Sequence, residues 1–204
     1  VGLDPDLSRM PESIVSGRSA GAAIVEFNKR IIDATAEYAA AYKPQFAMYV
    51  QYGPEGYEAL LRTRELIPGD TPAILDCKIG DIASTMEPYA RAYFDEAHFD
   101  AITANPYMGS DSLAPVFDRP GKGVFVLCKT SNPGSGEIQN LDLAGGQPLF
   151  VEIASKVLEW NASAAATLGL VVGATYPAEL QRVREVAPNL LLLIPGIGSQ
   201  AGDL

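Results

Sequence analysis

The sequence predicts an α/β fold of the (β/α)8 or TIM barrel type, here lacking the eighth βα unit and forming one domain over residues 1–204. Three observations lead to this prediction. Strand-like runs alternate with helix-like runs, as in repeated βα units. The strand-like runs, such as GVFVLC at 123–128 and LLLLIPG at 190–196, are almost wholly apolar, as parallel strands buried on both faces are. A length of 204 residues also suits a single barrel domain.

Each predicted strand is a short apolar run that opens one unit. The strands are Val1–Asp4, Ala40–Ala47, Pro72–Lys78, Ala101–Asn105, Gly123–Lys129, Leu168–Gly173 and Leu190–Ile194. The runs between them have the apolar periodicity of amphipathic helices. These helices are Ser19–Tyr38, Pro54–Leu66, Ile82–Ala97, Asp111–Phe117, Leu149–Ala166 and Pro177–Ala187. Since the first strand begins at residue 1 and no eighth strand follows the seventh, we expect a barrel domain that is incomplete at both ends.

The composition excludes several classes of function. A formal net charge of −10 disfavours a broad surface for nucleic acid or an anionic membrane. No apolar run has the length of a transmembrane helix. Cys77 and Cys128, the two cysteines, lie within strand-like runs, and such cysteines are usually buried free thiols, which favours a reducing, cytoplasmic compartment. Two cysteines and one histidine provide no obvious zinc site, so no metal is expected.

The most informative motif is DCKIGDI at 76–82, which lies where an apolar strand ends. Side chains alternate between the two faces of a strand, so we expect Asp76 and Lys78 on one face and Cys77 on the other. Asp81 lies beyond the strand. A carboxylate beside an ammonium on a rigid strand forms a preorganised charged site. The alternative is an ordinary surface ion pair, which contributes about 0–1 kcal/mol.

Polar residues also follow the other predicted strands. All strands of a barrel run in one direction, so their C-terminal ends converge on the face that carries the active site. The residues at these ends are Asp4, Lys43, Asp76, Lys78, Asn105, Lys129, Thr130, Ser131, Thr175 and the turn 195–200. A glycine-rich turn after the seventh strand commonly binds phosphate through backbone N–H groups. We therefore expect an acid–base cluster beside a phosphate site.

The segment 130–148, TSNPGSGEIQNLDLAGGQP, is the one long loop that the sequence predicts. It follows the C-terminal end of the fifth predicted strand. Structureless loops of this length in a compact domain are usually functional or disordered. We expect a lid that closes over the site, and an inert excursion is the alternative.

Seven motifs, in order along nearly the whole chain, carry a resemblance to one enzyme family. They are VGLDPD at 1–6, KPQFA at 43–47, DxKxxDI at 76–82, NPYMG at 105–109, LCKTSNPGS at 127–135, GLVVGAT at 169–175 and LIPGIGSQ at 193–200. With these motifs the chain resembles the orotidine 5′-phosphate decarboxylases, in particular their longer bacterial subfamily. DxKxxD alone also occurs in related sugar-phosphate barrels, whereas KPQFA, KTSNPG and PGIGxQ together specify the decarboxylase.

The resemblance implies a metal-independent enzyme without a cofactor that converts orotidine 5′-phosphate to uridine 5′-phosphate, the last step of UMP biosynthesis. It places Lys43, Asp76 and Lys78 in a charged Lys-Asp-Lys-Asp array, with Lys78 as the proton donor to C6 of the pyrimidine. The fourth member, Asp81, reaches into the site of the partner subunit, which implies a homodimer with shared active sites.

The same resemblance implies the substrate contacts. They are Asp4 to the ribose, Ser131 to the pyrimidine, Gln200 and the turn at Pro195 to the phosphate, and Ile82 and Thr85 across the dimer interface beside Asp81. Each has a plainer alternative, such as a strand-end cap for Asp4, a turn former for Ser131 and loop polarity for Gln200. Two residues depart from the family pattern: Ile79 stands where many members carry Arg, and Ala201 where Gly is usual. The family's phosphate-binding arginine follows the eighth strand.

Loss of CO₂ from C6 leaves carbanion character that no neighbouring carbonyl delocalises. Catalysis must therefore be electrostatic and must favour the transition state over the substrate. Asp76 would disfavour the substrate carboxylate, and Lys78 would stabilise the developing charge. Lys43 and Asp81 would hold these two groups ionised, because an opposite charge nearby favours the charged form.

Two other functions stay open at this point. A sugar-phosphate decarboxylase or aldolase of the same superfamily would use Mg²⁺ to stabilise an enediolate. Such enzymes carry Glu where Lys43 stands, which argues against them. A non-catalytic barrel that binds nucleotide or phosphate as a sensor would have no use for an array of buried charges, which are costly to keep.

Overall fold

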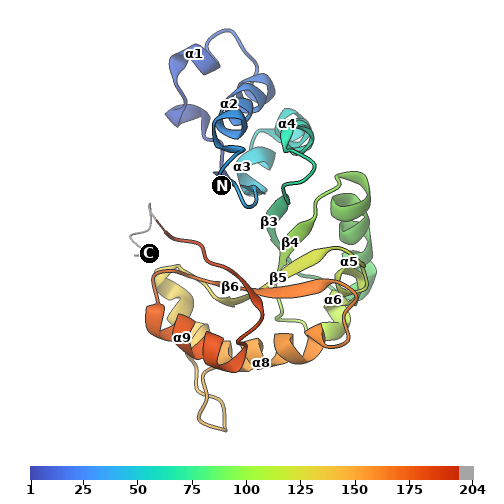
Figure 1. Ribbon diagram of the computed structural model, residues 1–204, viewed down its shortest axis with the longest axis vertical. Coiled ribbons are helices and arrows are strands. Elements are labelled where there is room, and N and C mark those ends of the chain that lie inside the picture. The colour runs from blue at the N-terminus through green and yellow to red at the C-terminus, as the bar shows by residue number, and fades with distance from the viewer. Residues whose placement is uncertain (198–204) are drawn as a thin grey trace. The chain divides into compact units, whose positions relative to one another are not determined.

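The structure is a computed structural model that describes residues 1–197, and it divides into two compact units. The first unit comprises residues 1–77 and 91–102, and the second comprises residues 78–90 and those from 103 onward. Figure 1 shows the strands and helices of each unit, coloured along the chain. Each unit is built from parallel strands that alternate with helices.

The first unit contains the beginning of the parallel strand succession. Strand β1 (Gly2–Leu3) pairs in parallel with β2 (Lys43–Pro44). Isolated parallel bridges from Tyr42 and Gln45 continue this pairing to Ala73 and Asp76, at the start of β3. Lys43 and Asp76, which were predicted to lie at the ends of the second and third strands, both take part in this pairing.

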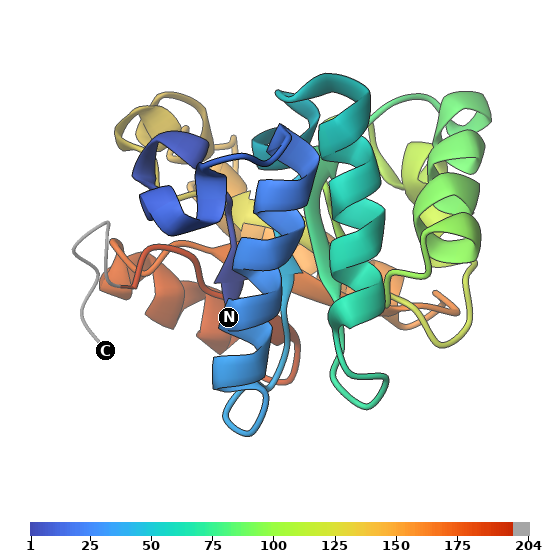
Figure 2. The same cartoon turned by 90° about the horizontal axis from the view of Figure 1, so that it is seen from above.

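The first unit also contains several helices. They are the 3₁₀-helix η1 (Leu7–Arg9), α1 (Glu12–Val15), α2 (Ala20–Thr35), α3 (Ala47–Val50), α4 (Gly53–Leu66) and the π-helix η2 (Arg91–Glu96). Helices α2 and α4 lie side by side, as Figure 2 shows from above. Helix α2 begins after Ser19, whose Oγ accepts a hydrogen bond from the N–H of Ala22 at 3.4 Å and so caps the first turn.

The second unit contains a sheet in the order β3-β4-β5-β6-β7, which β3 (Ile74–Ile79) and β4 (Ala101–Ala104) enter with their last residues. The other three strands are β5 (Gly123–Lys129), β6 (Thr167–Val172) and β7 (Leu191–Leu193), all parallel. The β5–β6 register shifts between Leu127 and Lys129, at the C-terminal end of β5. The predicted pyrimidine contact, Ser131, follows shortly after this irregularity.

The helices of the second unit are α5 (Ala83–Ala90), α6 (Ser110–Phe117), the 3₁₀-helix η3 (Pro133–Ser135), α7 (Gly136–Gln139), α8 (Leu149–Asn161) and α9 (Pro177–Val186). Helix α8 packs on β5 and β6 and also contacts α9 (Figure 1). An ion pair of 2.7 Å between Arg119 Nη2, just beyond α6, and Glu87 Oε1 joins this segment to α5. The core of this unit is apolar and includes the fully buried Val124, Val126 and Leu170.

Several predicted elements differ from the structure. The predicted strand Ala40–Ala47 is a strand only at Lys43–Pro44, and the predicted helix Leu149–Ala166 ends at Asn161. The loop 130–148 is not structureless, because η3 and α7 form within it, and the N–H of Thr130 donates to Oε1 of Gln139 at 2.9 Å. The first predicted helix ends at Thr35 rather than Tyr38. The predicted helix 82–97 is α-helical only to Ala90 and continues as a π-helix; Pro88, inside α5, has no N–H to donate to a helical hydrogen bond. No helix among residues 1–197 is long and apolar enough to cross a bilayer.

Candidate active site

Three of the predicted site residues come together in the first unit. Lys43 Nζ lies 3.1 Å from Oδ2 of Asp76 and 3.9 Å from Oδ1 of Asp4. The lysine is half-buried, Asp76 is 8 % exposed and Asp4 is exposed. One ammonium therefore bridges a buried and an exposed carboxylate at the ends of adjacent parallel strands. A charged hydrogen bond of this kind is stronger than a neutral one.

The backbone beneath this cluster is fixed by hydrogen bonds. The N–H of Phe46 donates to the carbonyl of Asp76 at 3.1 Å. The hydroxyl of Tyr49 donates to the carbonyl of Leu3 at 3.1 Å, immediately before Asp4. Burial raises the pKa of the Tyr49 hydroxyl above its usual range, so the group stays protonated and available as a donor.

A buried polar chain supports Tyr49 from behind. Asn28 Nδ2 donates to the hydroxyls of Tyr49, at 2.9 Å, and of Thr63, at 3.0 Å. Asn28 and Thr63 are both fully buried, so these hydrogen bonds are not exchanged with water. The chain runs from α4 through α2 and α3 to the carbonyl of Leu3, and it ties the position of Asp4 to the helical layer.

Lys78 has an unusual backbone conformation. It lies in β3, is exposed, and has φ 49°, in the left-handed region that side chains disfavour. Its N–H donates to Oγ1 of Thr103 at 2.8 Å, which helps to fix this conformation. The strict alternation of side chains assumed from the sequence therefore does not extend through Lys78. Strain of this kind gathers at functional sites.

The residues after Lys78 lead into α5. Oδ1 of Asp81 accepts a hydrogen bond from the N–H of Ile82 at 2.8 Å. Ile82 is 54 % exposed, and Thr85 in the first turn of α5 is half-buried. A Cβ added to Gly80 would lie only 3.0 Å from Cβ of Asn105, so the turns after β3 and β4 pack closely against each other.

Ser131 is held by the end of the neighbouring strand β6. Its carbonyl accepts a hydrogen bond from Oγ1 of Thr175 at 3.4 Å. A Cβ added to Gly173 would lie 2.8 Å from Cα of Ser131, closer than real contacts allow. The N–H of Gly173 donates to the carbonyl of Lys129 at 2.7 Å. The absence of a side chain at Gly173 is therefore a requirement for the position of Ser131.

Lys129 was given no role from the sequence beyond its place at a strand end, and it is the least expected feature of the site. Its side chain is 0 % exposed. Nζ donates to Oγ of Ser135 at 2.7 Å and lies 4.3 Å from the centre of the Tyr176 ring. The sequence did indicate this burial indirectly, because Lys129 ends the apolar run VFVLCK, a strand predicted to be buried on both faces.

The predicted phosphate turn is described only in part. The carbonyl of Pro195 accepts a hydrogen bond from the N–H of Ala174 at 2.9 Å, and Gly196 has φ 104°, which a side chain would disfavour. The phosphate-binding role of this turn stays a prediction. Gln200, the predicted phosphate contact, and Ala201 lie outside the described residues.

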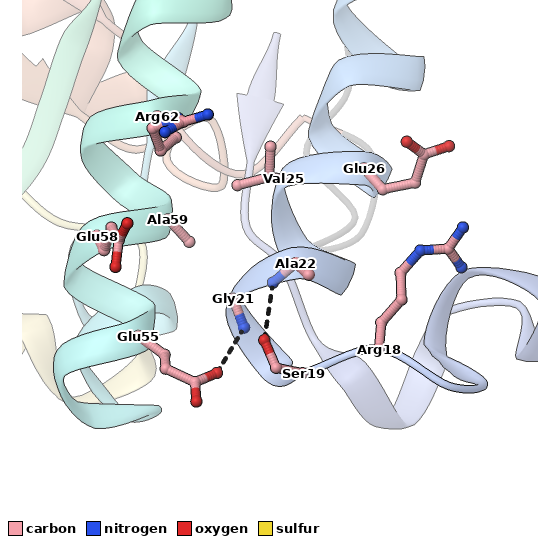
Figure 3. Close-up of a pocket in the computed structure, with 10 residues that line it drawn as sticks. All are labelled: Arg18, Ser19, Gly21, Ala22, Val25, Glu26, Glu55, Glu58, Ala59 and Arg62. Atoms are coloured by element: carbon pink, nitrogen blue, oxygen red, sulfur yellow. Dashed lines mark hydrogen bonds between the residues drawn. The ribbon is translucent and has the colours of Figure 1, made fainter.

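A separate pocket of about 430 Å³ lies in the first unit between α2 and α4 (Figure 3). The N–H of Gly21 donates to Oε2 of Glu55 at 3.2 Å, which links the two helices (Figure 3). Arg18, Glu26, Glu58 and Arg62 also line it, so its charges are mixed. No predicted site residue lines this pocket, and we do not assign it to the candidate active site.

Comparison with known proteins places the chain. The sequence profile described as "Orotidine 5'-phosphate decarboxylase / HUMPS family" matches residues 1–204. This chain belongs to that family. It is 51 % identical over 205 residues to a protein of Thermomicrobium roseum named orotidine 5′-phosphate decarboxylase, covering 100 % of this chain and 72 % of that protein. A protein of Halorubrum lacusprofundi with the same name is 50 % identical over 204 residues, with coverages of 100 % and 70 %.

Solved structures agree with the sequence relatives. The Leishmania donovani UMP synthase superposes with a TM-score of 0.90 at 46 % identity, covering 99 % of this chain and 42 % of that one. The Leishmania donovani OMP decarboxylase superposes with a TM-score of 0.86 at 46 % identity, covering 96 % of this chain and 73 % of that one. The predictions of the family and of a TIM-type α/β barrel are thereby confirmed. The roles of individual residues and the single-domain organisation stay predictions.

Proposed function

We propose that this chain catalyses the decarboxylation of orotidine 5′-phosphate to uridine 5′-phosphate, the last step of de novo pyrimidine synthesis, without a metal or cofactor. The observation that carries the proposal is the Asp4–Lys43–Asp76 cluster in a member of this family. Two carboxylates on one ammonium, at the ends of adjacent parallel strands, form a preorganised electrostatic site of the kind that this reaction requires.

In this mechanism Asp76 acts on the substrate carboxylate. Its side chain is nearly buried and is paired with Lys43 at 3.1 Å, which keeps it ionised. A second carboxylate brought next to it is disfavoured in the ground state, and the repulsion disappears as CO₂ leaves. Only an interaction that differs between substrate and transition state accelerates the step.

Lys78 would stabilise the negative charge that develops at C6 and then deliver the proton to that carbon. Its left-handed backbone, with φ 49°, supports this role, because a strained conformation is retained where a side chain must be aimed. The role predicts that Lys78→Ala loses nearly all turnover. Ser131 would contact the pyrimidine, Asp4 the ribose, and the turn at Pro195 with Gln200 the phosphate.

We also propose a homodimer in which Asp81 enters the partner subunit's site. Three large apolar side chains on the turns after β3 and β4 support an interface there: Ile82 is 54 %, Tyr107 90 % and Met108 44 % exposed. Exposed apolar side chains gathered on neighbouring turns often mark protein–protein contacts. The buried free thiol of Cys128 fits a reducing compartment, and we place the enzyme in the cytoplasm.

Mixing two inactive variants tests the shared site. In a heterodimer of Lys78→Ala and Asp81→Asn subunits, one of the two sites has both native residues. Random mixing makes half of the dimers heterodimers, so about a quarter of the wild-type activity should return. No return of activity on mixing, with heterodimers verified by mass, would contradict the assignment of Asp81 to the partner's site.

The activity itself is tested by the loss of orotidine 5′-phosphate absorbance in the presence of EDTA. The 204-residue chain is assayed beside a version that is completed with the segments flanking the match in the Thermomicrobium roseum relative. Turnover by either version that survives EDTA and is lost in Lys78→Ala supports the proposal. Turnover by neither, or turnover abolished by EDTA, would overturn it and favour the sensor or the sugar-phosphate enzyme respectively.

A further inference from the structure

We propose that Lys129 is a positioning residue, whose buried ammonium holds the turn 131–135 in the arrangement that receives the pyrimidine ring. The inference rests on the proposed function only in taking Ser131 as a contact to that ring. It assigns a task to a charged group that the decarboxylation mechanism does not use.

The burial of Lys129 requires an explanation. Lysine is almost never fully buried unless it is paired, because removing an ammonium from water is costly. Among the residues that the structure describes, no carboxylate lies within ion-pair distance of its Nζ. Its partners are the hydroxyl of Ser135 at 2.7 Å and the ring of Tyr176, whose centre lies 4.3 Å away. A hydrophobic side chain would fill this space without the cost of removing an ammonium from water. We therefore attribute the charge to the contacts that it makes with Ser135 and Tyr176.

Both partners of the ammonium also hold the turn itself. The N–H of Ser135 donates to the carbonyl of Asn132 at 3.1 Å, and the hydroxyl of Tyr176 donates to the same carbonyl at 3.3 Å. Lys129 therefore contacts the two groups that converge on Asn132, one from within the turn and one from the segment after β6. Removal of the ammonium would release both at once.

The turn is also packed tightly at its other end, so it has little freedom to rearrange if the ammonium is removed. Ser131 packs directly on Gly173, and its carbonyl accepts a hydrogen bond from Thr175 at 3.4 Å. The peptide between Ser131 and Asn132 is thus fixed by contacts from the segment after β6. Ser135, at the other end of the turn, is buried and bonded to Lys129. Contacts therefore fix the turn at both ends, and Lys129 makes the contact at the Ser135 end.

The test compares two ligands that share the ribose phosphate and differ in the base. UMP and ribose 5-phosphate are titrated calorimetrically into the wild-type chain and into Lys129→Met, which keeps the length of the side chain and removes the charge. We expect the affinity for UMP to fall about tenfold or more, since losing one hydrogen bond to the ring costs about 1.4 kcal/mol, which is tenfold in affinity. The affinity for ribose 5-phosphate should stay unchanged. Lys156→Met, the same change on the exposed face of α8, should alter neither affinity.

Two further measurements separate positioning from mere stability. Amide exchange in residues 131–135 should speed up in Lys129→Met while exchange in β5 and β6 stays slow. Ser135→Ala, which removes the acceptor and leaves the lysine in place, should show the same selective loss of UMP affinity if Lys129→Met fails to fold. Equal losses for both ligands, or unchanged UMP affinity, would overturn the inference. UMP binding by the wild-type chain, with no turnover of orotidine 5′-phosphate by either this chain or the completed version, would contradict the proposed function alone.

Discussion

Replacing Gly173 by alanine should displace Ser131 and so reduce catalysis. The new Cβ would lie 2.8 Å from Cα and 2.9 Å from N of Ser131, whereas ordinary contact begins at 3.4 Å, so the difference to be relieved is 3.4 − 2.8 = 0.6 Å. The atoms that must give way belong to the backbone and cannot rotate aside. A shift approaching 1 Å in a substrate-positioning group can cost about a hundredfold, so we expect kcat/KM to fall by about 10- to 100-fold. Overpacking should also lower the free energy of unfolding by about 1–3 kcal/mol.

The assay is steady-state decarboxylation of orotidine 5′-phosphate together with denaturant unfolding of the same preparations. Gly169→Ala is the matched control, because its Cβ would lie 2.8 Å from the carbonyl oxygen of Leu191 and from the Phe125 ring, within β6 but away from Ser131. It should lose stability to a similar degree and keep most of its kcat/KM. Gly145→Ala, with nothing within 4 Å, should change neither quantity. A Gly173→Ala enzyme whose kcat/KM falls no further than that of Gly169→Ala would refute the reasoning.

Three other substitutions have defined outcomes. Tyr49→Phe removes the donor to the Leu3 carbonyl and one acceptor of Asn28, so the free energy of unfolding should fall by about 1–3 kcal/mol in urea titrations, and an unchanged midpoint would contradict the buried chain. Burial raises the pKa of the Cys128 thiol to about 12. Above about pH 9 the unfolded thiol therefore ionises while the folded one keeps its proton, and stability should decline with rising pH by up to about 1.4 kcal/mol per unit. Unfolding at pH 8 and pH 10 should show a smaller decline in Cys128→Ala than in the wild type; equal declines would contradict this. Asp76→Asn keeps the shape but removes the charge opposite Lys43, and kcat should drop by about a hundredfold or more in the absorbance assay; near-native kcat would exclude the electrostatic role.

Most strands were predictable because their composition is nearly uniform, whereas the polar residues of the predicted strand Ala40–Ala47 left a strand only at Lys43–Pro44. The fifth strand has the predicted bounds, Gly123–Lys129, since an apolar run flanked by Gly and Thr leaves little freedom at either end. Helix ends were less predictable. Helix α2 stops at Thr35, whose hydroxyl donates back to the carbonyl of Ile31 at 2.7 Å and contacts the Tyr42 hydroxyl at 2.8 Å, a contact with the segment before β2 that no periodicity reveals.

The charged cluster could be anticipated for a similar reason. The C-terminal ends of parallel strands converge, so the sequence alone predicts that Asp4, Lys43 and Asp76 lie near one another. The position of Ser131 could not, because it depends on how closely the turn after β5 approaches Gly173. The burial of Lys129 was equally hidden, since the sequence shows a strand end but not which side chains close over it.

The left-handed backbone of Lys78 has a consequence for evolution and for protein engineering. A residue with a side chain pays roughly 1–2 kcal/mol for this conformation, whereas glycine adopts it freely. Selection for thermal stability alone would therefore replace the proposed proton donor with glycine. Any stability-guided redesign of this barrel must hold the position fixed, and Lys78→Gly should melt higher than Lys78→Ala while both are inactive.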